Sequence, residues 1–370
     1  MLHEIPEIHA NEVGMDQEKL DHAFSLLKKA VDDNRIPGAV AMVGRHHHIV
    51  GKYSVGYSII SDSIQHETEI NTIYDCASLT KVVVTLPLVL KLVEKGLLEL
   101  SDPISRYLPE FQKGKKSAIT IQHLLTHTSG LKPFVNLTFD GWRPAEIKQF
   151  IYSQTVEEGP DKRVIYSDIG FMILGEIVSK ILGQPLDLAA KKYIFEPLGM
   201  ADSQFCPPKS LQKRIAATEF REDLGRYLWG EVHDERAYAL GGVSGHAGLF
   251  ATAGDLARYA LMWLNDGELG GTHLLSPLTV KTALENHTAA LDGNRGLGWV
   301  LKGDSFDASG SFFSPLCYGH TGFTGTSIWM DPHVGLFVVL LTNRVHFGRD
   351  HSITRLRKIF HNAVAASIFD

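Results

Sequence analysis

Residues 74–90 read YDCASLTKVVVTLPLVL, a short polar loop followed by a long apolar stretch. From Leu79 to Lys95 the chain is hydrophobic on nearly every side, which is typical of a helix buried inside a large protein. Gly96 is a natural end for this helix. Ser78 and Lys81 therefore lie where a loop enters a buried helix.

The spacing Ser-x-x-Lys occurs four times, starting at Ser25, Ser78, Ser129 and Ser210, so the pattern alone identifies nothing. Only Ser78 lies where free N–H groups and the positive end of a helix dipole would favour a developing oxyanion. Lys81 shares its helix face, so the amine can reach the hydroxyl. A buried lysine is costly without partners. The pair is therefore either a nucleophile with its base, or a capping serine beside a lysine that extends to solvent.

Tyr166-Ser167-Asp168 directly precedes a second predicted buried helix, Ile169 to Leu182. Ser167 or Asp168 is a suitable N-cap for that helix, but a tyrosine before the cap needs another explanation. A lysine ammonium beside a phenol favours the phenolate, which can act as a base. The segment is therefore either a simple helix cap or a cap combined with a proton-transfer group.

Residues 319–329 read GHTGFTGTSIW and predict two strands joined by a glycine-rich connection. Glycine lets a ligand come close to the backbone. An ordinary hairpin would have the same composition. This stretch therefore indicates a functional site only in combination with the motifs at Ser78 and Tyr166.

Both ends of the chain predict β-structure with an outer helix, and the middle predicts helices. A helix capped by Asp16 and running to about Asp33 precedes two strands, Ala39–Gly44 and His48–Tyr57. Near the other end we expect four strands and a last helix, at Gly296–Leu301, Leu316–Thr321, Gly325–Met330, Leu336–Thr342 and Ile353–Phe369.

This order predicts an α+β fold with one antiparallel β-sheet built from both chain ends, flanked by helices and interrupted by an inserted, mainly helical region. We expect residues 1–60 plus 290–370 to form the sheet domain and residues 61–289 the helical domain. The active site would lie at the interface of the two domains.

Composition excludes several classes of protein. The chain has 370 residues, 44% hydrophobic and 21% charged, with a net charge of −6, which is ordinary globular usage and argues against nucleic acid as a partner. Three cysteines without a CxxC pair predict no disulfide framework. We expect no membrane span, and a cytoplasmic location because no signal peptide is visible. The oligomeric state stays open.

Taken in this order, the three motifs resemble the serine penicillin-recognising enzymes, the superfamily of β-lactamases, D-alanyl-D-alanine peptidases and related esterases. The tyrosine that opens the second motif and the His-Thr-Gly of the third are similar to the class C β-lactamase-like branch. The resemblance covers most of the chain and includes ITIQHLLTHTSGL (119–131), GHAGLFATAGDL (245–256), GLGW (296–299) and LTNR (341–344).

The resemblance implies a role for each motif. Ser78 would be the nucleophile that forms an acyl-enzyme, and Lys81 and Tyr166 would share the general-base and general-acid work. The backbone N–H groups of Ser78 and Phe323 would form the oxyanion hole. The substrate would also be contacted by the residues of the third motif, His320, Thr321 and Gly322.

Two residues depart from the pattern of many relatives. Asp168 stands where they have asparagine, and an ionised carboxylate accepts hydrogen bonds but cannot donate one to a substrate carbonyl. We expect Asp168 to pair with Lys81 and keep it charged. His320 replaces a lysine, so it offers a positive charge to a substrate carboxylate only when protonated.

A polar loop, Glu231-Val232-His233-Asp234, precedes the glycine-rich stretch 241–246. We expect it to line the cleft, where Glu231, His233 or Asp234 would contact substrate. With His246 the loop could hold a metal, but the spacing fits no standard ligand pattern. We therefore expect neither a metal nor a cofactor.

The leading hypothesis for function is a serine hydrolase that acts through an acyl-enzyme on a small ester, a D-amino-acid peptide or a muropeptide-like substrate. A true β-lactamase is the second hypothesis, disfavoured by Asp168, by His320 and by the missing export signal. The third is a non-catalytic binding or sensor module that keeps the fold, against which the complete set of serine, lysine and tyrosine argues.

Overall fold

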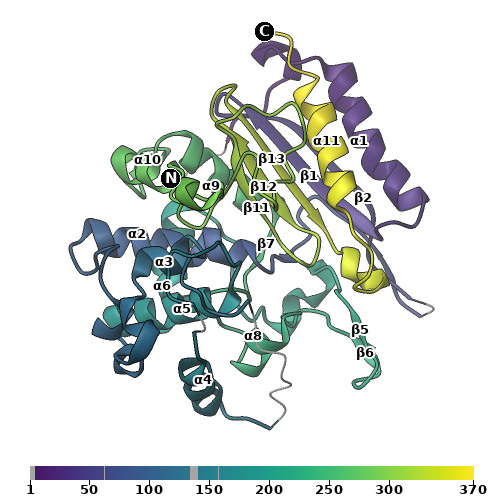
Figure 1. Ribbon diagram of the computed structural model, residues 1–370. Coiled ribbons are helices and arrows are strands. Elements are labelled where there is room, and N and C mark those ends of the chain that lie inside the picture. The colour runs from purple at the N-terminus through teal and green to yellow at the C-terminus, as the bar shows by residue number, and fades with distance from the viewer. Residues whose placement is uncertain (1–4, 62, 134–140, 157) are drawn as a thin grey trace.

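The computed structural model describes residues 5–61, 63–133, 141–156 and 158–370. At its centre is a seven-stranded antiparallel sheet with the strand order β10-β11-β12-β13-β1-β2-β3 (Figure 1). The strands are β1 (Gly38–Arg45), β2 (His48–Ile60), β3 (Gln65–Glu67), β10 (Val300–Leu301), β11 (Tyr318–Thr321), β12 (Ser327–Asp331) and β13 (Leu336–Thr342). Because β1 pairs with β13, the two ends of the chain meet in the middle of one sheet. The predicted α+β class is confirmed.

Helices cover both faces of the sheet, which is why its central strands are buried throughout. Ala41 and Val43 of β1 belong to a cluster with α1 (Gln17–Asp32) and α11 (Thr354–Ala365), which lie side by side in Figure 1. The alternate residues Val40 and Met42 face the main core, where α9 (Ala253–Leu264) packs on β1 and β13.

The middle of the chain forms the helical part beside the sheet (Figure 1). Its helices are α2 (Leu86–Glu94), α3 (Ile121–Leu125), α4 (Pro144–Ser153), α5 (Asp168–Leu182), α6 (Leu186–Ala190), α7 (Glu196–Leu198), α8 (Glu235–Ala239) and α10 (Pro277–Leu284). One hydrophobic cluster contains Val339 of the sheet as well as Leu174 of α5, so the core is continuous. The proposed division at residues 60 and 290 stays a prediction.

Several element boundaries differ from the sequence-based ones. The predicted helix from Leu79 contains a π-helical segment, Lys81–Thr85, before α2 begins. The predicted strand from Gly296 is shorter, because the chain first turns through Gly298 at a φ of 74°. The predicted strand from Gly325 also begins two residues later, at Ser327, since Gly325 has a φ of 126°. The last helix ends at Ala365 rather than Phe369.

In the described part of the chain, three short two-stranded sheets were not predicted. They pair β4 (Tyr74–Asp75) with β7 (Phe250–Ala251), β5 (Phe220–Arg221) with β6 (Arg226–Tyr227), and β8 (Glu268–Leu269) with β9 (Thr272–His273). Two-residue strands carry too little alternation to be recognised in a sequence. The first of them matters for the site, because β4 leads directly into Ser78.

Among the described residues, no single helix is long and apolar enough to span a bilayer. Helix α5 and the segment Leu186–Leu198 would meet the length and composition criteria only together, and they are bent by 75° relative to each other.

Candidate active site

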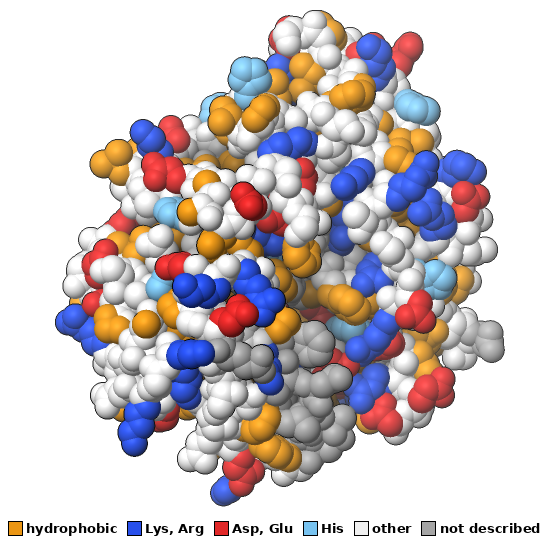
Figure 2. All heavy atoms as spheres, viewed as in Figure 1, with side chains coloured by type: hydrophobic (Ala, Val, Ile, Leu, Met, Phe, Trp, Pro, Cys, Tyr) orange, Lys and Arg blue, Asp and Glu red, His pale blue; other side chains and the backbone are white. Residues whose placement is uncertain are grey.

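A cleft of about 940 Å³ opens between the helices and the side of the sheet formed by β10 and β11. Figure 2 shows hydrophobic and basic side chains gathered around the hollow near the middle of this face. The cleft is lined by residues of all three motifs, namely Ser78, Tyr166, Asp168, His320, Thr321, Gly322 and Phe323, and by His233 and Asp234 of the polar loop. Segments far apart in the sequence thus converge on one cavity.

Ser78 and Lys81 form a directly bonded pair at the floor of the cleft. Ser78 is half-buried in the turn before the helix, and the Lys81 side chain has no exposed surface. The Lys81 ammonium donates to the Ser78 hydroxyl at 3.0 Å, to the Asp168 carboxylate at 2.8 Å and to the carbonyl of His246 at 3.2 Å. The lysine therefore does not extend to solvent. It also opens the π-helical segment, a distortion found frequently at functional sites.

The charge state of Lys81 follows from its partners. Burial alone would lower the pKa of Lys81, but the Asp168 carboxylate and the Tyr166 phenol outweigh burial and raise it. Lys81 is thus an ammonium in the resting site. The pairing of Lys81 with Asp168 that the sequence predicted is present.

The Tyr166 ring is held among side chains from several segments. The Lys81 ammonium lies 4.9 Å from its ring centroid, and the His127 and Phe306 ring centroids lie 4.6 and 5.2 Å away. Ser167 caps α5 by accepting from the Gly170 N–H, so the predicted cap is present as well. The distances leave the ring little freedom to rotate away from Lys81.

His127 fixes the backbone of this motif, a role that the sequence did not reveal. Its Nδ1 accepts the Ser167 N–H at 3.0 Å, and its carbonyl accepts the Ile165 N–H. Burial lowers the pKa of His127 well below its usual value, and nearby cations add to the effect. A neutral ring is what an Nδ1 acceptor requires.

Asp168 also belongs to a network of charged side chains that includes Arg236, Asp234 and His246. Arg236 lies 3.3 Å from Asp168 and 2.7 Å from Asp234, which in turn lies 2.8 Å from His246 Nε2. Burial raises the pKa of Asp168, but Lys81, His246 and Arg236 outweigh it and lower the pKa. Asp168, Asp234 and His246 offer ligand atoms within 4.8 Å of one another. Because Lys81 and Arg236 already neutralise the two carboxylates, this cluster is better suited to an ion-pair network than to a metal.

The two predicted oxyanion donors come from segments that are bonded to each other. Within the described part of the chain, the N–H groups of Ser78 and Phe323 donate to no protein acceptor. The hydroxyls of Thr324 and Thr326 donate to the carbonyls of Asp75 and Cys76 at 2.7 and 3.0 Å, and so join the turn after β11 to the loop before Ser78. The donors are therefore held rigidly while remaining available to an oxyanion.

Gly322 is required by this close approach. A Cβ atom at Gly322 would lie 2.5 Å from the Cys76 carbonyl oxygen, closer than real contacts allow. The glycine in the His-Thr-Gly motif therefore lets the turn pack against the nucleophile loop. The sequence predicted that this glycine lets a ligand approach the backbone. In this structure it lets the backbone at Gly322 approach the backbone at Cys76.

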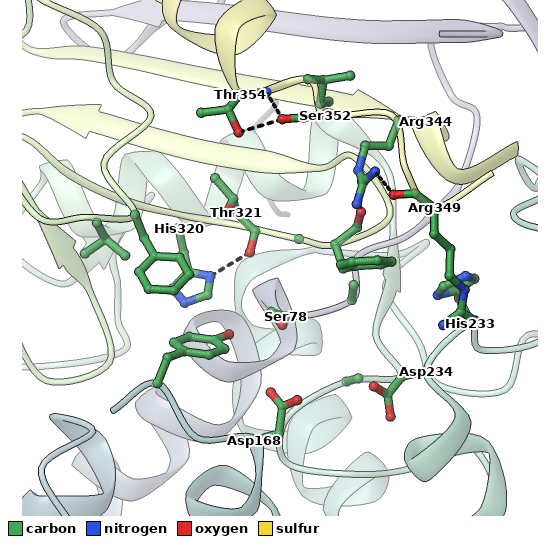
Figure 3. A pocket seen from close by; sticks show the side chains of 18 of the residues that line it. Ser78, Asp168, His233, Asp234, His320, Thr321, Arg344, Arg349, Ser352 and Thr354 are labelled. Atoms are coloured by element: carbon green, nitrogen blue, oxygen red, sulfur yellow. Dashed lines mark hydrogen bonds between the residues drawn. The ribbon is translucent and has the colours of Figure 1, made fainter. Parts of the chain in front are cut away.

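His320 is placed in the cleft but cannot supply a charge. The residue is 2% exposed, and its Nδ1 lies 2.9 Å from the Thr321 carbonyl (Figure 3). Burial, together with Lys81 and Arg295, lowers the pKa of His320 well below its usual value. The sequence left the charge of this histidine open, and its surroundings make the ring neutral at physiological pH.

The polar loop lines the cleft, but its side chains are bonded to protein groups. His233 Nε2 lies 3.1 Å from Glu219, and its ring stacks on Phe323 with centroids 5.8 Å apart. Asp234 caps α8 and pairs with Arg236. Glu231 pairs with Arg226 and is not part of the cleft wall. Substrate contact by His233 and Asp234 stays a prediction, and the geometry favours supporting roles.

A sequence model of the Beta-lactamase family matches residues 24–362. The chain belongs to the beta-lactamase family. A relative from Salmonella schwarzengrund, "Putative D-alanyl-D-alanine carboxypeptidase", is 34% identical over 373 residues, covering 91% of this chain and 85% of the relative. The resemblance inferred from the three motifs is thus confirmed.

Solved structures share the fold of this chain. EstCE1, described as a hydrolase with promiscuous acyltransferase activity, has a TM-score of 0.74 at 20% identity and covers 94% of this chain and 99% of its own. A class C beta lactamase from Rhodobacter sphaeroides has a TM-score of 0.71 at 19% identity, with 93% and 98% covered. At these identities the likeness shows the fold alone.

Proposed function

We propose that this member of the beta-lactamase family is a serine hydrolase that cleaves an ester or amide through an acyl-enzyme on Ser78. One observation carries the proposal, the 3.0 Å bond between the Lys81 ammonium and the Ser78 hydroxyl, with Asp168 anchoring the same ammonium at 2.8 Å. A nucleophile bonded to a charged, oriented partner in a cleft is the arrangement that covalent catalysis requires.

The proton transfers follow from the charges. Lys81 is protonated, so it orients the hydroxyl and stabilises negative charge, and Tyr166 reacts in its phenolate form, whose oxygen takes the Ser78 proton. Ser78 Oγ bonds to the substrate carbonyl carbon, and the N–H groups of Ser78 and Phe323 stabilise the oxyanion. Tyr166 then protonates the leaving group as its bond to carbon breaks. Water repeats the sequence on the acyl-enzyme, with Tyr166 again as the base, and releases the acid.

Two guanidinium groups favour a substrate that carries an anion. Arg344 donates to the Phe323 carbonyl at 2.8 Å, and Arg357 donates to the carbonyls of Gly322 and Thr326 at 3.0 and 2.8 Å. Both line the cleft, and within the described residues neither forms an ion pair with a carboxylate. Burial, aided by Arg344, lowers the pKa of Arg357 to about 9. A substrate carboxylate would relieve this excess charge, which fits a peptide with a free C-terminus and the name of the Salmonella relative.

Hydrolysis by wild type and by Ser78→Ala tests the proposal. The substrates are p-nitrophenyl acetate, a peptide ending in D-alanyl-D-alanine and a chromogenic cephalosporin. We expect Ser78→Ala to lower the rate on every substrate that wild type cleaves by about 10³-fold or more. The matched control is Ser25→Ala, since Ser25 begins another Ser-x-x-Lys on the surface helix α1.

Each outcome has one meaning. Unchanged turnover in Ser78→Ala would refute the proposal, and absence of any turnover by wild type would favour a non-catalytic module. Cephalosporin hydrolysis comparable to that of the peptide would support the second hypothesis, a true β-lactamase.

A further inference from the structure

Phe306 is an exposed aromatic residue inside the cleft. It is 48% exposed, it lines the cavity, and its ring stacks on Tyr166 with centroids 5.2 Å apart and planes 29° apart. An exposed phenyl surface contributes little to folding, because it is not removed from water. A phenyl ring that is exposed yet held against a reacting side chain indicates contact with a ligand.

A buried ion pair holds Phe306 in place. Arg295 is 1% exposed and donates to both carboxylate oxygens of Asp304, from Nε at 3.0 Å and from Nη2 at 2.9 Å. The same carboxylate accepts the Phe306 N–H at 2.8 Å. The guanidinium carbon lies 4.9 Å from the Phe306 ring centroid and 5.8 Å from that of Tyr166. Burying both charges carries a large desolvation penalty, so the pair is better explained by what it positions than by stability.

A second phenylalanine on the same connection shows the contrast. Phe312 is 65% exposed, and its N–H bonds to Asn362, a residue of α11. It is absent from the cleft wall. Phe312 therefore supplies a control of the same residue type outside the cleft.

The contact between Phe306 and Tyr166 places Phe306 on the leaving-group side of the substrate. The acid that protonates a leaving group must lie within hydrogen-bond reach of the leaving atom. In the proposed function that acid is Tyr166, so the leaving group departs beside the ring that covers Tyr166. Stacked aromatic pairs and apolar contacts would then favour a planar or large apolar leaving group.

We propose that Phe306 is a specificity-determining residue that binds an apolar part of the leaving group, and that Arg295 and Asp304 are positioning residues for it. The inference rests on the proposed function and narrows its substrate class. The preferred ester carries an aromatic or large aliphatic alcohol. The preferred peptide ends in a large apolar residue rather than in alanine.

The test compares ethyl acetate with 2-phenylethyl acetate, which share the acyl group and differ in the apolar part of the alcohol. We expect wild type to prefer the phenylethyl ester. Phe306→Ala should lower the ratio of the two kcat/KM values by about 5–10-fold, mainly through KM. Phe306→Tyr should restore most of the ratio, and Arg295→Met and Asp304→Ala should lower it as Phe306→Ala does. Phe312→Ala should leave it unchanged.

The outcomes separate the two proposals. An unchanged ratio in Phe306→Ala, while Ser78 still hydrolyses both esters, would overturn the role of Phe306 and leave the hydrolase intact. An equal fall in Phe312→Ala would also overturn it. If wild type showed no Ser78-dependent hydrolysis of these esters or of p-nitrophenyl acetate, both the proposed hydrolase function and the role of Phe306 would be refuted. Because Phe306 is exposed, its variants should fold, so a failure of Arg295→Met to fold would not obscure the result.

Discussion

Replacing Lys81 with methionine is expected to lower kcat/KM for p-nitrophenyl acetate by about 10²–10⁴-fold. Methionine has a similar length and no charge, so it fills the buried site while removing the hydrogen bond to Ser78 and the ammonium beside Tyr166. The decline should appear mainly in kcat, since the ammonium stabilises charge that develops only during reaction. Initial rates over a range of ester concentrations measure both parameters.

The control for this substitution lies on the protein surface. Lys28 completes the Ser-x-x-Lys that begins at Ser25, and it pairs with Asp32 in an exposed position. Lys28→Met should leave kcat/KM unchanged within about twofold, because exposed ion pairs contribute little. Activity of Lys81→Met within tenfold of wild type would contradict the role assigned to Lys81.

Replacing Asp168 with alanine is expected to destabilise the protein by about 3–5 kcal/mol at pH 7, because it leaves the buried Lys81 without its carboxylate. The double variant Lys81→Met/Asp168→Leu, which removes both charges, should recover most of this loss while remaining inactive. Denaturant unfolding at pH 7 gives the free energies. A double variant no more stable than Asp168→Ala would contradict the account of this pair.

The destabilisation caused by Asp168→Ala should depend on pH. Because the folded-state pKa of Asp168 is lowered, mainly by Lys81 against the effect of burial, its ion pair contributes full stability above the unfolded pKa of about 4. That contribution is lost as the pH falls through the folded pKa. The difference in unfolding free energy between wild type and Asp168→Ala should therefore be constant from pH 5 to 7 and shrink below about pH 4.

The sequence predicted those parts of the fold that rest on periodicity. The strand at Leu336–Thr342 has the predicted bounds, and the hairpin of β1 and β2 and the buried helix α5 lie close to theirs. Boundaries shifted where glycine allows a turn, as at Gly298 and Gly325. The π-helical segment at Lys81 was not predicted, because the hydrophobic pattern of the sequence has no signature for it.

The site was predictable where chemistry is local. Ser78 and Lys81 are three residues apart where a loop enters one helix, so their contact is local. The pairing of Lys81 with Asp168, 87 residues later, was expected only from the family resemblance. Arg295 and Phe306 were not found, because nothing in their neighbourhood indicates that they meet Tyr166, more than 120 residues earlier in the chain. The polar loop was singled out by composition alone, and composition does not distinguish a substrate ligand from a side chain already bonded to protein.

The most direct test of the central claim is to identify the residue that becomes acylated. Wild-type protein is quenched in acid during turnover of p-nitrophenyl acetate, or after reaction with a fluorophosphonate, and is then analysed by intact mass and by peptide mapping. We predict a single adduct on Ser78, absent from Ser78→Ala and unaffected in Ser25→Ala. An adduct on another residue, or steady turnover with no adduct under either condition, would contradict the account.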